Sequence, residues 1–248
     1  MSTDQIPFAK RTGNVFSTGN PLELQDGTFL VLLGVEQPNG NFTSAYMIIN
    51  KVLEIVKQPQ EIQIPEWHGA SQNSFPLAVT KHNGLYRVLL HRRSSNFIES
   101  EIHEITTKNI LELFNTNNGV LSSQVIHKAK NETGYLHGKA DDVSYISYNS
   151  KLYILIGSEE LPSEYLTSFN REYGLMSLED KQWIHDERSP LIVNPVNIYN
   201  KYPEFEWTSD HLGGFISPLI RDDYLYLFLT FGTDNPDYLI SGIKIKLE

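Results

Sequence analysis

The sequence predicts an all-β protein with the architecture of a β-propeller, and three observations support this prediction. First, one unit recurs along the chain: a short apolar strand, a tight turn and a strand rich in aromatic residues. Second, helical signals are short and few, so no layer of helices is expected to cover a sheet. Third, the chain has 248 residues, which corresponds to about five blades at ~40–50 residues each. A β-sandwich or a jelly roll of the same length is the alternative.

The unit occurs four times, and three of its copies open on a histidine. These three copies begin at His68, His137 and His211, whereas the fourth, near Asn20, has no histidine ahead of it. The paired strands of the four copies are, in chain order, Asn20–Leu24 with Phe29–Leu33, Phe75–Val79 with Leu85–Leu89, Asp142–Ile146 with Leu152–Ile156, and Ser217–Ile220 with Leu225–Leu229. The first strand starts close to an x-Pro step in three copies, and Asp142-Val143 replaces that step in the remaining one.

Turn-forming residues join the two strands of each copy, and a third strand is expected to follow. The turns are Gln25-Asp26-Gly27, His82-Asn83-Gly84, Asn149-Ser150 and Arg221-Asp222-Asp223. The third strands are expected at Ala45–Asn50, Ile98–Ile105, Tyr173–Leu175 and Tyr238–Ile245. Short helices are expected at Thr107–Phe114, Pro162–Phe169 and Leu178–Trp183, with Thr106 or Thr107 as the cap of the first. The interval from about residue 157 to 200 is long enough for a further, degenerate blade. No linker interrupts the chain, so we expect one domain over residues 1–248.

Composition narrows the classes of partner and of chemistry. The formal net charge is −10 and no basic stripe is present, which disfavours nucleic acid and anionic membranes as partners. The absence of cysteine excludes disulfides and thiolate chemistry. Residues 1–5 lack the features of a signal peptide, and no apolar run has the length of a membrane span. We therefore expect a soluble, cytoplasmic protein, although a trimmed chain would look the same.

The three histidines are expected to converge on one site. In a propeller the first strand of each blade lines the central channel, and the loop that enters it lies at one mouth. His68, His137 and His211 stand 8, 6 and 7 residues before Pro76, Val143 and Pro218, in such entry segments. Three imidazoles with an open position suit Zn²⁺ or another divalent ion, and Zn²⁺ or Ca²⁺ is the cofactor to be considered. Without a metal, the same imidazoles can bind a polar ligand and exchange protons with it. The third possibility is a structural role, in which each histidine forms a hydrogen bond with the backbone of a neighbouring blade.

Carboxylates and tryptophans lie next to these histidines in the sequence. Asp142 stands at the start of an apolar strand, where a charge is costly unless it serves a ligand, a partner or a turn. It takes the place of x in the x-Pro step, so it is expected to face the channel mouth. The stretches around Trp67 and Trp207 correspond to each other, because each places a tryptophan beside carboxylates just before a histidine. Such a pairing offers a flat apolar face and hydrogen-bond acceptors, although inter-blade packing explains the tryptophans as well. The residues expected to bind substrate are Trp67, Glu206, Trp207, Asp210, Asn20 and Ser217.

The recurring unit resembles the blades of the five-bladed propeller glycosidases, the arabinanase, β-xylosidase and levansucrase-like group. Residues 20–33, 75–90, 142–156 and 217–229, about a quarter of the chain, carry this resemblance. The resemblance implies an Asp in the first blade as base or nucleophile, a second Asp that orients, and a Glu as general acid. By position Asp142 matches the second Asp, and Glu206 and Glu159 are candidates for the acid. Asn20 stands at the first position and cannot serve as a carboxylate base, so ordinary hydrolysis by paired carboxylates is not expected.

These residues together predict an enzyme with a polar His/Asp site at the channel mouth. We expect a hydrolase, lyase or isomerase that acts on a small polar or glycan-like substrate by acid–base chemistry, for example in secondary metabolism. Its catalytic residues would be His68, His137, Asp142 and His211. One alternative is a divalent-metal enzyme that uses the three histidines as ligands. Another is a non-catalytic propeller that binds glycans or proteins at pockets between its blades.

Overall fold

The structure is a computed structural model, and it describes residues 15–36, 42–62, 73–93, 100–116, 118–129, 139–159, 171–187, 189, 217–232 and 238–246. Strands dominate these residues, as expected. The first eight strands are β1 (Val15–Glu23), β2 (Phe29–Glu36), β3 (Phe42–Ile49), β4 (Ile55–Glu61), β5 (Asn73–His82), β6 (Leu85–Arg93), β7 (Ser100–Thr107) and β8 (Val120–Lys128). The others are β9 (Lys139–Tyr148), β10 (Lys151–Glu159), β11 (Arg171–Glu179), β12 (Gln182–His185), β13 (Ser217–Arg221), β14 (Tyr224–Gly232) and β15 (Tyr238–Lys246).

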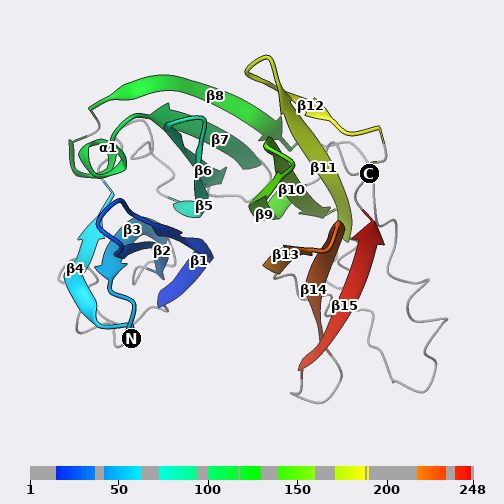
Figure 1. Ribbon diagram of the computed structural model, residues 1–248, viewed down its shortest axis with the longest axis horizontal. Helices are drawn as coiled ribbons and strands as arrows, with labels where there is room; N and C mark the ends of the chain where they lie inside the picture. The colour runs from blue at the N-terminus through cyan, green and yellow to red at the C-terminus, as the bar shows by residue number, and fades with distance from the viewer. Residues whose placement is uncertain are drawn as a thin grey trace. The chain divides into compact units, whose positions relative to one another are not determined.

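The described strands form four antiparallel sheets, each built from strands that follow one another in the chain (Figure 1). The first three sheets have four strands, β1–β4, β5–β8 and β9–β12, and the last has three, β13–β15. Five blades were expected, so the described part of the chain accounts for one sheet fewer than predicted. A further blade was expected within residues 157–200. This prediction is wrong for residues 171–185, because they form β11 and β12 of the third sheet. The rest of that interval lies mostly outside the described residues.

The tight turns explain why consecutive strands pair. In four hairpins both central residues have positive φ: Asn83 and Gly84, Asn149 and Ser150, Asp180 and Lys181, Asp222 and Asp223. Two residues in this conformation match the right-handed twist of the flanking strands, and asparagine, aspartate and glycine tolerate it best. Three of these turns were predicted from the sequence. The fourth corrects the expected helix at Leu178–Trp183, because the Asp180-Lys181 turn pairs Glu179 with Gln182 in β11 and β12.

One helix, α1 (Ile110–Thr116), lies within the described residues. It begins later than the expected Thr107–Phe114, because Asn109 rather than a threonine caps it. The side-chain oxygen of Asn109 accepts a hydrogen bond from the Glu112 backbone N–H at 3.2 Å, as an N-cap does. The Thr107 hydroxyl instead accepts a bond from the Asn109 N–H at 3.1 Å and ends β7. The helix expected at Pro162–Phe169 lies outside the described residues.

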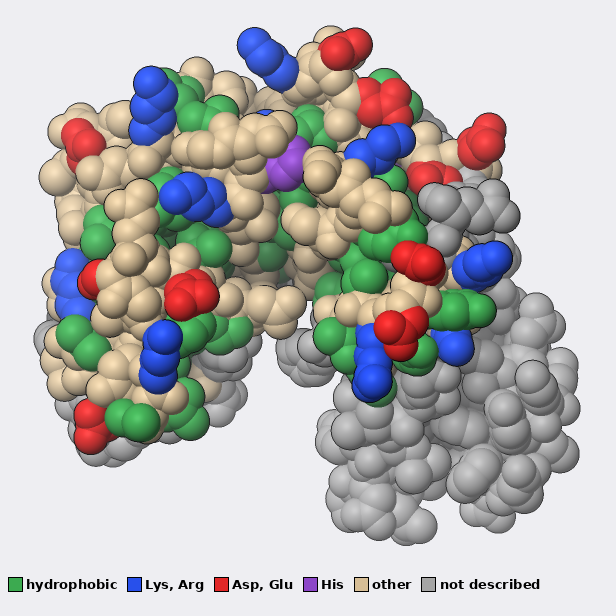
Figure 2. All heavy atoms as spheres, in the orientation of Figure 1, with side chains coloured by type: hydrophobic (Ala, Val, Ile, Leu, Met, Phe, Trp, Pro, Cys, Tyr) green, Lys and Arg blue, Asp and Glu red, His purple; other side chains and the backbone are tan. Residues whose placement is uncertain are grey.

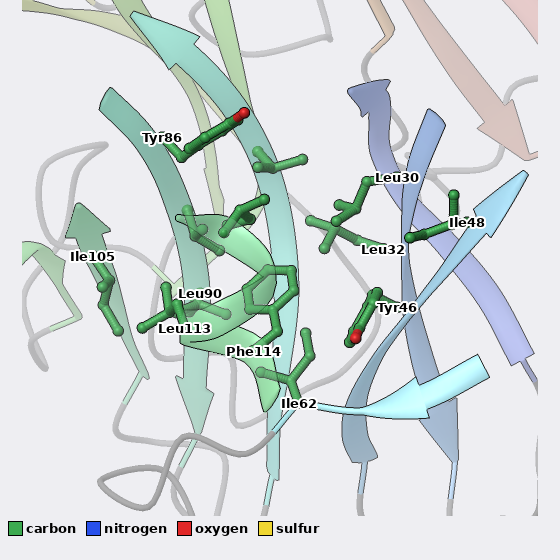
Figure 3. Close-up of a cluster of buried hydrophobic side chains, with 13 residues drawn as sticks. Leu30, Leu32, Tyr46, Ile48, Ile62, Tyr86, Leu90, Ile105, Leu113 and Phe114 are labelled. Carbon is green, nitrogen blue, oxygen red and sulfur yellow. The ribbon is translucent and has the colours of Figure 1, made fainter. Parts of the chain in front are cut away.

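The chain forms two compact units, Met1–His127 and Lys128–Glu248. In the first unit β5 packs against β1, β2 and β3, and the core lies between the first two sheets and α1 (Figure 3). Tyr46 and Phe114 meet in this core with ring centroids 5.3 Å apart. The Tyr46 hydroxyl donates to Asn115 at 2.6 Å and accepts from the Lys57 ammonium group at 2.6 Å, so its burial leaves no hydroxyl unsatisfied.

The second unit repeats this arrangement with its own pair of sheets. Leu155 and Leu175 of the third sheet pack against Leu225 and Leu227 of the fourth, and the first strands β9 and β13 are in contact. The Tyr148 hydroxyl, at the end of β9, donates to the Asp223 carboxylate at 2.8 Å. This hydrogen bond raises the pKa of Tyr148, because the neutral phenol is the donor. In both units, therefore, the first strands of successive sheets are neighbours, as in adjacent propeller blades.

On the face drawn in Figure 2, acidic and basic side chains of the described residues are interspersed rather than gathered by sign. Among the described residues, no helix has the length and apolar character that crossing a membrane requires.

Candidate functional site

Most of the predicted site residues lie outside the part of the chain that the structure describes. This holds for His68, His137 and His211, and also for four of the residues expected to bind substrate, Trp67, Glu206, Trp207 and Asp210. Their convergence therefore remains a prediction. The other three predicted residues lie on first strands of sheets: Asn20 in β1, Asp142 in β9 and Ser217 at the start of β13.

The first strands of three sheets have an irregular pairing register close to the x-Pro position, or to Asp142-Val143 in its place, where the sequence predicted the site. In β1 the register shifts between Thr18 and Leu22, so Gly19, Asn20 and Pro21 stand against a single residue of β2. In β5 the shift falls between Pro76 and Ala78. Such β-bulges redirect side chains and are over-represented next to active sites.

The third bulge involves the paired aspartates. Asp142 is opposite Gly157 and Ala140 is opposite Ser158, so Asp141 has no partner of its own in β10. The break in the ladder thus falls on the two acidic residues that open an apolar strand. Glu159, a candidate acid, is opposite Lys139 and two residues beyond Gly157. Its backbone lies about 7 Å along β10 from Gly157, the residue opposite Asp142. Asp142 and Glu159 therefore share one end of the third sheet.

In the first unit the bulges of β1 and β5 touch each other. Gly19 has a φ of +63°, and a Cβ on this residue would lie 2.6 Å from the Leu77 carbonyl oxygen and 3.0 Å from the Ala78 Cα atom. Leu77 is itself the extra residue of the β5 bulge. The close approach therefore requires glycine, and it fixes the backbone next to Asn20, whose side chain is exposed.

The bulges offer different chemistry in the two units. In β1 the bulge presents an amide, which can donate and accept hydrogen bonds but cannot act as a base. In β9 it carries two consecutive carboxylates. Because these groups differ, the β1 and β9 bulges are not equivalent to each other, and of these two only the β9 bulge carries ionisable side chains.

The described residues contain no group of three or more histidine, aspartate or glutamate side chains that could hold a metal ion. The predicted histidine ligands are not among those residues, so this observation does not bear on them.

A pocket that the sequence did not predict lies on the third sheet. Its volume is about 430 Å³, and its lining is Lys151, Tyr153, Ser177, Glu179, Ile184, His185, Asp186 and Glu187. The residues come from three strands and the segment after them, so no local motif marks them. Strand alternation alone would have placed Lys151 with Tyr153, and Ser177 with Glu179, on common faces.

Comparison with known proteins identifies the fold. No family model matches the chain, and no curated protein matches it by sequence. A Bacillus megaterium levansucrase mutant has a similar structure, with a TM-score of 0.63, 10% identity, and coverage of 94% of this chain and 66% of that one. An α-L-arabinofuranosidase from Lactobacillus brevis has a TM-score of 0.56 and 12% identity, with coverage of 92% of this chain and 68% of that one. A Cellvibrio cellulosa α-L-arabinanase mutant has a TM-score of 0.53 and 12% identity, with coverage of 93% of this chain and 71% of that one.

The chain thus has the β-propeller fold of these glycoside-processing proteins, and the resemblance predicted from the sequence is confirmed at the level of the fold. It spans about two thirds of the length of the levansucrase chain. Identities near a tenth carry the fold alone, because a propeller supports many unrelated functions.

Proposed function

We propose that this protein is an enzyme that acts on a small polar or glycan-like substrate by acid–base chemistry at the bulged ends of its first strands. The observation that carries the proposal is the β9 bulge, which breaks the strand ladder at Asp141 and Asp142. Bulges are over-represented next to active sites, and a carboxylate at the start of an apolar strand is costly unless it serves a ligand, a partner or a turn. The names of the similar structures, a levansucrase, an arabinofuranosidase and an arabinanase, support a sugar-like substrate.

In this proposal Asp142 orients or deprotonates a histidine, and one of His68, His137 and His211 exchanges the proton with the substrate. Glu159 is the better candidate for a second acid, since it shares one end of the third sheet with Asp142. Trp67 and Trp207 would stack on the substrate, and Asn20, Ser217, Glu206 and Asp210 would bind its polar groups.

We also propose that the complete propeller has five blades and that the protein is located in the cytoplasm.

Replacement of Asp142 by asparagine tests the site directly. We expect turnover on a panel of neutral glycans and small glycosides to fall by about 10²–10⁴-fold, the usual contribution of a positioned acid or base. The melting temperature should stay nearly unchanged. Asp222→Asn is the matched control, because Asp222 is an exposed turn residue of the same unit, and it should keep full activity. Full activity in Asp142→Asn would remove Asp142 from the mechanism. Binding without turnover by the native protein would contradict the enzyme assignment itself.

The alternative in which three histidines hold a divalent ion such as Zn²⁺ makes a separate prediction. If acid–base chemistry operates without a metal, untagged protein should contain less than one equivalent of any divalent ion. Its turnover should also survive dialysis against a chelator. One stoichiometric ion, with activity lost on chelation and restored by that ion, would favour the metal enzyme.

A further inference from the structure

The pocket on the third sheet has a regular construction. Tyr153 of β10 is opposite Ser177 of β11, which is opposite Ile184 of β12. These three residues therefore form one row across the face of the sheet. Lys151 and Glu179 extend the lining one step toward the hairpin ends of β10 and β11.

One wall of this pocket is fixed by hydrogen bonds rather than left as a free loop. The backbone N–H of Asp186 donates to the Leu175 carbonyl oxygen at 2.9 Å. The Ser189 hydroxyl accepts from the Leu175 N–H at 2.8 Å and donates to the same carbonyl at 3.1 Å. The segment after β12 is thereby clamped to β11, and the pocket is formed before any ligand arrives. Preformed sites avoid the entropic cost of ordering a loop on binding.

The lining combines donors, acceptors and a partly apolar floor. Lys151 donates, the carboxylates of Glu179 and Glu187 accept, and the Tyr153 hydroxyl does both. The Ser177 hydroxyl donates to Glu179 at 3.0 Å, which orients that carboxylate. Ile184 and the Tyr153 ring supply apolar surface. Loss of surrounding water lowers the pKa of His185, which favours the neutral imidazole.

This combination suits a sugar. Each sugar hydroxyl can donate and accept a hydrogen bond, and the apolar face of the sugar ring can pack on the Tyr153 ring. A volume of about 430 Å³ is within the usual range of small-ligand sites. The lining includes three acidic residues and one lysine, so uronic acids and sulfated sugars are disfavoured as ligands.

The pocket is separate from the site proposed above. Asp142 is opposite Gly157, whereas the pocket uses Tyr153 and Lys151, four and six residues earlier on β10. At the rise of an extended strand this separation is about 13 and 20 Å. A ligand in the pocket is therefore separated along the strand from the β9 bulge.

We propose that this pocket is a second, non-catalytic binding site for a residue of a neutral glycan. It would hold a polymeric ligand while chemistry takes place elsewhere. The choice of a glycan over other hydroxyl-rich ligands rests on the proposed function.

Affinity electrophoresis in gels that contain arabinan, levan or xylan tests the proposal. The native protein should be retarded by at least one of these neutral polysaccharides. The variant Lys151→Ala/Glu179→Gln should bind it at least tenfold more weakly, while turnover of a small soluble substrate stays unchanged. The matched control is Lys108→Ala/Glu112→Gln, which removes the same charges from exposed positions in the first unit and should bind normally.

The outcomes separate this proposal from the proposed function. Asp142→Asn should lose turnover and keep its retardation. If no variant or native protein shows turnover but the pocket variant still loses retardation, the pocket stands and the enzyme assignment fails. Equal retardation of the pocket variant and native protein, or no retardation of the native protein, would overturn the pocket. Both double variants should give the circular dichroism spectrum of the native protein, which checks that they are folded.

Discussion

Glu104→Gln is expected to destabilise the protein by about 3–5 kcal/mol, the usual effect of removing one partner from a buried ion pair. Glu104 has no exposed surface, and Arg87 is 8% exposed. The Arg87 Nη1 atom donates to the Glu104 Oε2 atom at 2.9 Å, and the Gln124 amide donates to the same oxygen at 2.9 Å. Removal of the negative charge leaves the Arg87 guanidinium buried without its counter-ion, and the loss should appear as a lower urea midpoint with an unchanged m-value.

The double variant Arg87→Met/Glu104→Leu is the control for this result. It removes both charges and fills the space with apolar groups, so its stability should be close to or above that of the native protein. A double variant as unstable as Glu104→Gln would mean that packing, not charge, explains the loss. A change below about 1 kcal/mol in Glu104→Gln would show that solvent reaches the pair.

The inner strands could be predicted from the sequence because their residues are apolar and their turns are specific. Leu30, Leu32 and Leu33 in β2 are fully or almost fully buried, and Asn83-Gly84 adopts the conformation that its composition favours. The outermost strands β4, β8 and β12 were missed. They lie at sheet edges, where most residues face solvent and the apolar signal is weak: Val56, Leu121 and Ile184 are all exposed.

The candidate site could be predicted only in part. The sequence marked Asp142 as a charge at the start of an apolar strand, and Asn20 through the first-blade position of the resemblance. It could not show that a bulge lies at each, since a bulge depends on how two strands pair. The same reason hid the pocket: Tyr153, Ser177 and Ile184 become neighbours only through the register of three strands.

Gly19→Ala is expected to destabilise the protein by more than about 3 kcal/mol, well above the ordinary effect of a point mutation. Two causes add. A φ of +63° disfavours any side chain by about 1–2 kcal/mol. In addition, the new Cβ would lie 2.6 Å from the Leu77 carbonyl oxygen and 3.0 Å from the Ala78 Cα atom. Both are backbone atoms, so neither can move aside without shifting β5, and the unfolding midpoint in urea measures the sum.

Gly84→Ala separates the two causes, because Gly84 has a similar φ of +75° but no atom within 4 Å of an added Cβ. Its cost should be limited to the conformational term of about 1–2 kcal/mol. The difference between the two variants therefore measures the contact between the β1 and β5 bulges. Equal losses would mean that this contact yields easily and does not fix the backbone next to Asn20. A larger loss for Gly19→Ala would show that the two first strands are rigidly held where the sequence predicted the site.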